Sequence, residues 1–176
     1  MKRLIWVVPA ILFLCASAKA QETPWLELSG GYSYLQGNVA SSPTFHMQGG
    51  TGSIRENMNS WFGGSFTFNA WGGTFDSNNI SAQTYTFGPV FSYRRFDRIT
   101  PYAHVEFGAI HGSQGYLDIS ESAFKFAMTA GGGADFRFGS RTAVRAQADY
   151  LMSRFLNTRQ DNLVYSVGLV FYIGNK

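Results

Sequence analysis

The chain has 176 residues, with 14 basic and 11 acidic side chains, one cysteine and many aromatic residues and glycines, a length that suits one domain. Three of the basic residues lie in an expected leader, and without them 11 basic residues face 11 acidic ones. The basic balance of the whole chain is therefore no evidence for nucleic-acid binding, which needs a clustered basic face. Cys15 lies in the same leader, so the remainder has no disulfide framework, thiolate metal site or cysteine nucleophile.

Residues 1–20 predict a secretory signal peptide. A basic start precedes an apolar run from Leu4 to Cys15, and a small-x-small pattern ends at Ala20. The run is too short to span a membrane as a helix. We expect cleavage between Ala20 and Gln21 and a mature domain of residues 21–176. No later run is long enough for a membrane-spanning helix, so insertion into a membrane would require a closed barrel.

Eight segments of the mature chain alternate apolar and polar side chains, as strands with one apolar face do. The alternation is longest in the sixth segment and least clear in the second, where Gly49, Gly50 and Gly52 interrupt it. The expected strands are residues 25–35, 45–55, 61–71, 85–93, 100–111, 123–138, 142–152 and 163–173, within a residue or two at each end.

The alternation alone fits a soluble sandwich, with the apolar faces inward, or a membrane barrel, with the apolar faces on lipid. Long connections after the odd strands, at residues 36–44, 72–81, 112–121 and 153–162, favour the barrel, as do strands of ten or more residues. Aromatic residues at strand ends are typical of membrane interfaces. We expect six of them there: Trp25, Tyr34, Trp61, Trp71, Tyr85 and Tyr93. The sequence thus predicts an all-β fold, an eight-stranded antiparallel up-and-down transmembrane β-barrel.

In such a barrel the polar faces of the strands fill the lumen. An eight-stranded barrel is only just wide enough for its own side chains, and buried charges must pair. We therefore expect a closed interior joined by salt bridges. Its expected members are Glu27, Arg94, His104, Glu106, Lys125, Asp135, Arg137, Arg145, Gln147 and Asp149.

Four stretches carry a family resemblance: Phe87-Gly-Pro-Val-Phe-Ser-Tyr-Arg-Arg95, Thr100-Pro-Tyr-Ala-His104, Ala130-Gly-Gly-Gly-Ala-Asp135 and Gln147-Ala-Asp-Tyr-Leu-Met152. They resemble the small outer-membrane β-barrel family, which is similar to the transmembrane domain of outer membrane protein A. The resemblance implies a monomer in the cell outer membrane, with outer-membrane lipid and the barrel-assembly machinery as partners. It also implies that Phe171, Tyr172 or both serve as the terminal assembly signal.

The resemblance also raises an enzymatic alternative, because some small outer-membrane barrels deacylate lipid A with serine, histidine and an acid. His104 and Glu106 share one face, and Ser92 lies on the neighbouring expected strand. A lipid hydrolase needs its nucleophile towards lipid, whereas these residues have the polar parity. We therefore expect no catalytic residue. We also expect no cofactor, and no metal site, because His46 and His111 lie near loop ends with no second ligand at metal spacing.

The expected function is structural, adhesive or ligand-binding through the four long loops, with no partner named by their short polar sequences. Three alternatives stay open: a narrow channel, a lipid-A-modifying enzyme, and a soluble periplasmic barrel that binds a small hydrophobic ligand.

Overall fold

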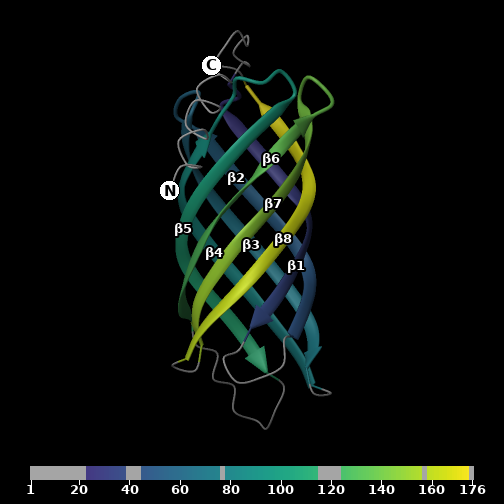
Figure 1. Ribbon diagram of the computed structural model, residues 1–176, viewed down its shortest axis with the longest axis vertical. Coiled ribbons are helices and arrows are strands. Elements are labelled where there is room, and N and C mark those ends of the chain that lie inside the picture. The colour runs from purple at the N-terminus through teal and green to yellow at the C-terminus, as the bar shows by residue number, and fades with distance from the viewer. Residues whose placement is uncertain (1–22, 39–44, 76–77, 115–123, 156–157, 175–176) are drawn as a thin grey trace, which may run out of the picture.

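Figure 1 shows the computed structural model, which describes residues 23–38, 45–75, 78–114, 124–155 and 158–174. Within them, eight strands form one closed barrel, in which each strand pairs antiparallel with its neighbours in sequence and β1 pairs with β8. The strands are β1 (Leu26–Asn38), β2 (Phe45–Asn57), β3 (Phe62–Phe75), β4 (Asn78–Ser92), β5 (Ile99–Gln114), β6 (Lys125–Arg137), β7 (Thr142–Phe155) and β8 (Thr158–Ile173). The predicted eight-stranded up-and-down barrel is confirmed.

The expected leader and its cleavage site between Ala20 and Gln21 lie outside the described residues. No helix in the described ranges is long and apolar enough to cross a membrane.

The apolar faces of the strands point outward. On β8, Tyr165, Val167, Leu169 and Phe171 are 46–51% exposed, whereas the intervening Val170 is buried. Phe107, Phe126 and Phe136 are likewise exposed on the wall of the barrel. An apolar surface of this extent is costly in water and is typical of a wall that contacts lipid.

One end of the barrel carries the start of β1, the end of β8 and the turns at residues 58–61, 93–98 and 138–141 (top of Figure 1). In outer-membrane barrels with an even number of strands, the start of the first strand and the end of the last lie on the periplasmic side. We call this the periplasmic end and the opposite one the outer end.

The outward side chains are apolar only over part of each strand. On β8 the apolar run extends from Leu163 to Ile173, and the next outward position is Asp161. Ten steps correspond to roughly 33 Å along a strand and, with the usual tilt, to about 25 Å across the membrane. We call this zone the apolar belt. Its outer edge is also marked on two other strands, where Gln48 of β2 and Gln83 of β4 are outward.

The strands extend further beyond this belt than the sequence suggested. β3 and β4 pair as far as Phe75 and Asn78, and β7 and β8 as far as Phe155 and Thr158. Most of the loops expected at residues 72–81 and 153–162 is therefore strand, and the expected alternation of long and short connections was wrong. The cause is solvent: a strand that leaves the membrane can carry polar residues on its outer face, so its sequence resembles a loop.

Candidate functional site in the barrel interior

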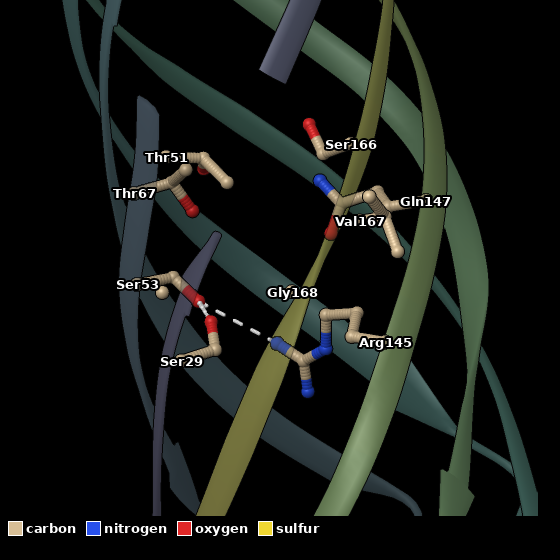
Figure 2. A pocket seen from close by; sticks show the side chains of 10 residues that line it. Ser29, Thr51, Ser53, Thr67, Arg145, Gln147, Ser166, Val167 and Gly168 are labelled. Atoms are coloured by element: carbon tan, nitrogen blue, oxygen red, sulfur yellow. Dashed lines mark hydrogen bonds between the residues drawn. The ribbon is translucent and has the colours of Figure 1, made fainter. Parts of the chain in front are cut away.

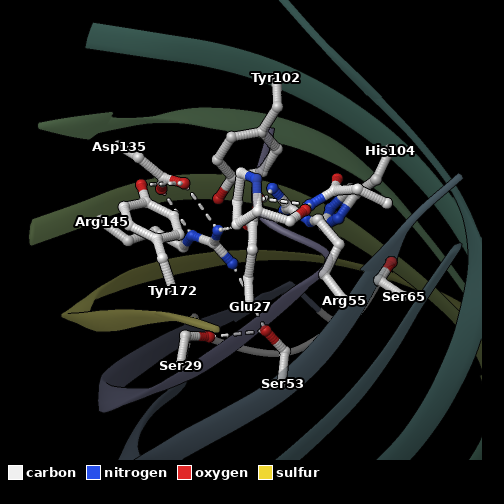
Figure 3. A network of polar contacts seen from close by, with 12 residues as sticks. Glu27, Ser29, Ser53, Arg55, Ser65, Tyr102, His104, Asp135, Arg145 and Tyr172 are labelled. Carbon is white, nitrogen blue, oxygen red and sulfur yellow. Dashed lines mark hydrogen bonds and ion pairs between the residues drawn. The ribbon is translucent and has the colours of Figure 1, made fainter. Parts of the chain in front are cut away.

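The periplasmic half of the lumen is built around Glu27 of β1, which is buried (Figure 3). Its carboxylate accepts hydrogen bonds from Arg55 (3.2 Å), Arg94 (2.6 Å) and Arg145 (2.9 Å). Asn57 donates a further bond of 2.9 Å. These residues come from β1, β2, β7 and the turn at residues 93–98, so one carboxylate joins segments around the lumen. Because isolated buried ions are costly, this pairing is what makes the charged interior tolerable.

Asp135 of β6 and two tyrosines complete this network. The Nε and Nη2 groups of Arg145 donate to the two carboxylate oxygens of Asp135, at 2.7 and 2.8 Å, a bidentate geometry that strengthens the pair. The guanidinium groups of Arg55 and Arg145 lie 4.1 and 4.9 Å from the centre of the Tyr102 ring. The Tyr172 hydroxyl donates to Asp135 at 3.5 Å. The Tyr102 ring thus supports both cations through cation–π contacts.

A second polar network lies around Glu106 of β5. This buried carboxylate accepts hydrogen bonds from the hydroxyls of Ser65 (2.6 Å), Thr67 (2.9 Å) and Thr86 (2.7 Å). His104 lies between two carboxylates, with Nδ1 3.6 Å from Glu106 and Nε2 2.9 Å from Asp149. Hydroxyl groups therefore solvate Glu106 in place of water.

Gln147 connects the two networks. Its amide nitrogen donates to Asp149, and its amide oxygen accepts a bond from the Tyr102 hydroxyl. The Tyr102 ring also contacts the arginines of the first network. Polar contacts are thus continuous over much of the lumen.

A small cavity of about 20 Å³ lies beside Arg145 and Gln147 (Figure 2). Hydroxyl groups of Ser29, Ser53 and Ser166 also line it. This volume is enough for about one water molecule. It is far too small for a solute, so it offers a hydration site within the packing.

Towards the outer end the interior becomes apolar. Seven buried side chains from seven strands form one cluster, and Ile80 and Ala82 of β4 pack against it. We call the seven residues together with Ile80 and Ala82 the apolar ring, and all eight strands contribute to it. The seven are Leu35, Met47, Trp71, Ile110, Ala127, Leu151 and Val164. The ring lies at the outer edge of the apolar belt, where outward positions such as Gln48 and Gln83 are polar. The two faces of the wall thus exchange polarity where the barrel leaves the membrane.

Nine of the ten expected lumen residues lie inside the barrel. Gln147 and Arg137 are half-buried, and the latter stacks on Tyr172 with its guanidinium carbon 4.5 Å from the ring centre. The others are buried: Glu27, Arg94, His104, Glu106, Asp135, Arg145 and Asp149. The expectation for Lys125 was wrong. It has the inward parity, but it begins β6 at the outer rim, where its side chain is exposed to solvent.

Five of the six expected interface aromatics have outward or partly exposed side chains. Tyr34 is half-buried and donates or accepts a 2.7 Å bond with His46; the exposed ones are Trp25, Trp61, Tyr85 and Tyr93. Trp71 was wrongly expected at the interface, because its side chain is 3% exposed and its Nε1 donates to Ser33. It shares the parity of Ser65 and Thr67, which point into the lumen.

Several interior residues were missed by sequence reasoning: Arg55, Asn57, Ser65, Thr67, Thr86, Tyr102 and Tyr172, and the members of the apolar ring. The glycines of β2 obscured Arg55 and Asn57, although both lie on the same face of the strand as Ser53. The ring was missed because apolar residues of inward parity were not expected. Leu35 nevertheless has the parity of Glu27, which was the available signal.

The possible serine–histidine–acid set does not form a relay through Ser92. This residue lies opposite Tyr102 in the β4–β5 pairing, and its buried hydroxyl has no hydrogen-bond partner among the described residues. The carboxylate beside His104 Nε2 is that of Asp149, and the serine bonded to Glu106 is Ser65. In the described part of the chain, no group of three or more His, Cys, Asp or Glu side chains could hold a metal.

Several solved structures have a similar architecture. Neisserial surface protein A matches with a TM-score of 0.73 at 8% identity, over 84% of this chain and 97% of that one. Ail, the attachment invasion locus protein of Yersinia pestis, matches with a TM-score of 0.61 at 18% identity, over 85% and 100%. OprG of Pseudomonas aeruginosa matches with a TM-score of 0.59 at 7% identity, over 90% and 100%. At these identities the likeness concerns the fold.

No curated protein matches the sequence. The profile of the family described as "Outer membrane protein beta-barrel domain", in contrast, matches residues 7–171, which is nearly the whole chain. The outward apolar belt and the filled polar lumen are what such a domain requires. The chain therefore belongs to the outer membrane protein β-barrel domain family and is a protein of the cell outer membrane.

Proposed function

We propose that the protein is a closed, non-conducting barrel that serves as a membrane anchor for its outer end, with a structural or adhesive role. The observation that carries this proposal is the apolar ring, to which all eight strands contribute. A pore needs a continuous hydrated path, and a packed ring of Leu35, Trp71, Leu151 and their neighbours interrupts it. On the periplasmic side of the ring, the salt-bridged networks also fill the lumen.

The outer end is the part that an anchor would present. The hairpins β3–β4 and β7–β8 continue as paired strands beyond the apolar belt. Adhesion finds support in the likeness to Ail, whose name describes attachment and invasion and whose structure was also solved with the heparin analogue sucrose octasulfate. For this chain we propose that a partner binds at the outer end. The proposed state is a monomer inserted by the barrel-assembly machinery.

We also propose that the chain is not a lipid hydrolase. His104 and its two neighbouring carboxylates, those of Glu106 and Asp149, face the lumen. Serine and threonine hydroxyls donate hydrogen bonds to Glu106, and the amide of Gln147 donates one to Asp149. The acyl chains of a lipid would lie on the opposite side of the wall.

The closed lumen can be tested by thiol labelling, because residues 21–176 contain no cysteine. Ser33 is buried just inside the ring and accepts a bond from Trp71. A membrane-impermeant maleimide added from the outer side should not label Ser33→Cys. It should label Gln48→Cys, which is exposed on the outer wall. Adding Trp71→Ala to the Ser33 variant should open the ring and restore labelling.

Planar-bilayer recording on the unmodified protein completes this test. We expect no steady single-channel current, because the ring and the ion-paired networks leave no hydrated path. Steady currents together with labelling of Ser33→Cys at the rate of Gln48→Cys would contradict the proposal and support the narrow channel.

A further inference from the structure

Exposed arginines gather on one sector of the periplasmic end. Arg95 and Arg98 lie in the turn between β4 and β5, and Arg141 lies in the turn between β6 and β7; all three side chains are exposed. Asp97 is the one acidic residue in these two turns. The turn at residues 58–61, on another sector, has no charged residue. Among the described residues, the basic charge of this end is therefore one-sided.

Backbone contacts show that the two arginine-bearing turns are adjacent. The carbonyl oxygen of Arg98 accepts a 2.7 Å hydrogen bond from the backbone of Arg137, which ends β6. The carbonyl oxygen of Arg141 accepts a 2.9 Å bond from the backbone of Tyr172 on β8. The arginines therefore border a continuous part of the wall that runs from β4 to β8. We call this part, with its three arginines, the basic sector.

These three arginines differ from Arg94, which lies in the same turn. Arg94 is buried and pairs with Glu27, so it serves the interior. Within the described ranges, none of the three exposed guanidinium groups forms an ion pair with a carboxylate. Their charge is therefore available to an external partner.

The wall next to the basic sector is apolar. Ile99 pairs with Phe136 across β5 and β6, and these outward side chains are 40% and 45% exposed. Phe138, at the start of the turn that carries Arg141, is 67% exposed. A partner that satisfies both features has an anionic head at the level of the turns and a hydrocarbon part along the strands.

We propose that the basic sector binds the head group of an anionic glycerophospholipid in the periplasmic leaflet of the membrane. Guanidinium groups bind phosphate oxygens in a bidentate manner, and basic residues at a membrane surface attract anionic lipids. The acyl chains lie against Ile99, Phe136 and Phe138. An acidic cell-wall peptide would use the arginines but leave this apolar wall without a role, so the lipid fits more of the surface.

Lipid selectivity in nanodiscs tests the proposal. The protein is inserted into discs of phosphatidylethanolamine and phosphatidylglycerol, and the lipids that remain bound after mild detergent extraction are counted by native mass spectrometry. We expect phosphatidylglycerol to be enriched over its share in the disc. Arg98→Gln should lower this enrichment about fivefold, since each basic residue at the surface contributes on the order of a fivefold change in affinity. Arg98→Lys should keep part of it.

Lys125→Gln is the matched control, because it removes one exposed positive charge at the outer end. It should leave the enrichment unchanged, and heat-modifiable migration on gels verifies that each variant is folded. An equal loss in the Lys125 and Arg98 variants, or a bound-lipid ratio equal to that of the disc in the unmodified protein, would overturn the proposal. Displacement of phosphatidylglycerol by a soluble acidic muropeptide would also overturn it, in favour of a cell-wall partner.

Discussion

At the residue scale, Glu27 is the group on which the interior depends most. Its carboxylate contacts three guanidinium groups, and two of these come from residues 67 and 118 positions away in the chain. Asp135 is the other carboxylate that pairs with this cluster. Removing the charge of Glu27 would leave Arg55 and Arg94 buried without a carboxylate partner, which is the costly way to break a buried ion pair.

We therefore predict that Glu27→Gln lowers the free energy of unfolding by about 3–5 kcal/mol. The measurement is urea-induced unfolding of the protein in lipid vesicles, followed by tryptophan fluorescence. Glu56→Gln is the control, since Glu56 faces outward beside Leu26 and is exposed. The control should stay within about 0.5 kcal/mol of the unmodified protein. Equal stability of the two variants would show that the central ion pairs contribute little.

At the element scale, β2 shows how glycines serve the two faces of a wall differently. A Cβ atom on Gly49, which points inward, would overlap the backbone of Ala70 and Trp71 on β3. A Cβ atom on Gly50, which points outward, would meet its nearest atom, the carbonyl oxygen of Gly31, at 3.7 Å. The glycines that obscured the alternation of β2 therefore have distinct roles, and only the inward one is required by packing.

This difference gives a test with neighbouring positions. Gly49→Ala should force β2 and β3 apart and lower the free energy of unfolding by about 1–3 kcal/mol, the range for overpacking. Gly50→Ala should be neutral or raise it by up to about 1 kcal/mol, because alanine restricts the unfolded chain. Both values come from the same vesicle unfolding assay. A larger loss of unfolding free energy for Gly50→Ala than for Gly49→Ala would mean that β2 is paired in a different register.

At the scale of the whole molecule, the exchange of polarity along the wall sets where the membrane lies. Over the apolar belt, outward side chains are apolar and the lumen is ion-paired. Beyond it, outward positions such as Gln48 and Gln83 are polar and the lumen holds the apolar ring. In both regions the apolar side chains avoid water: they face lipid in the belt and the interior of the barrel beyond it. The outer end is thus built like a small water-soluble barrel standing on a membrane barrel.

Arginine substitution measures this boundary directly. Val167 is outward near the middle of the belt on β8, with 51% of its side chain exposed. Val167→Arg should lower the free energy of unfolding in vesicles by about 2–4 kcal/mol, whereas Gln48→Arg, at the outer edge, should cost about 0–1 kcal/mol. Similar costs at both positions would place the membrane elsewhere on the wall.

The sequence alone predicts the eight strands, the closed antiparallel barrel and the outward direction of residues such as Phe126 and Phe136. The strands and the two faces of each follow from a period of two, which is a local property of the chain, whereas the choice of a barrel over a sandwich also used strand length and the aromatic residues at strand ends. It also identified nine residues that lie in the lumen, because parity assigns each side chain to one face.

The assembled barrel, in contrast, sets which of these residues meet, and it places Trp71 inward and Lys125 in solvent. Contacts such as that between Glu27 and Arg145 cross the lumen, and they depend on the stagger of all eight strands around the closed barrel. Local periodicity also does not show whether lipid or water surrounds each level of the wall. For that reason the polar outer parts of β3, β4, β7 and β8 were expected to be loops, and the apolar ring inside them was not expected.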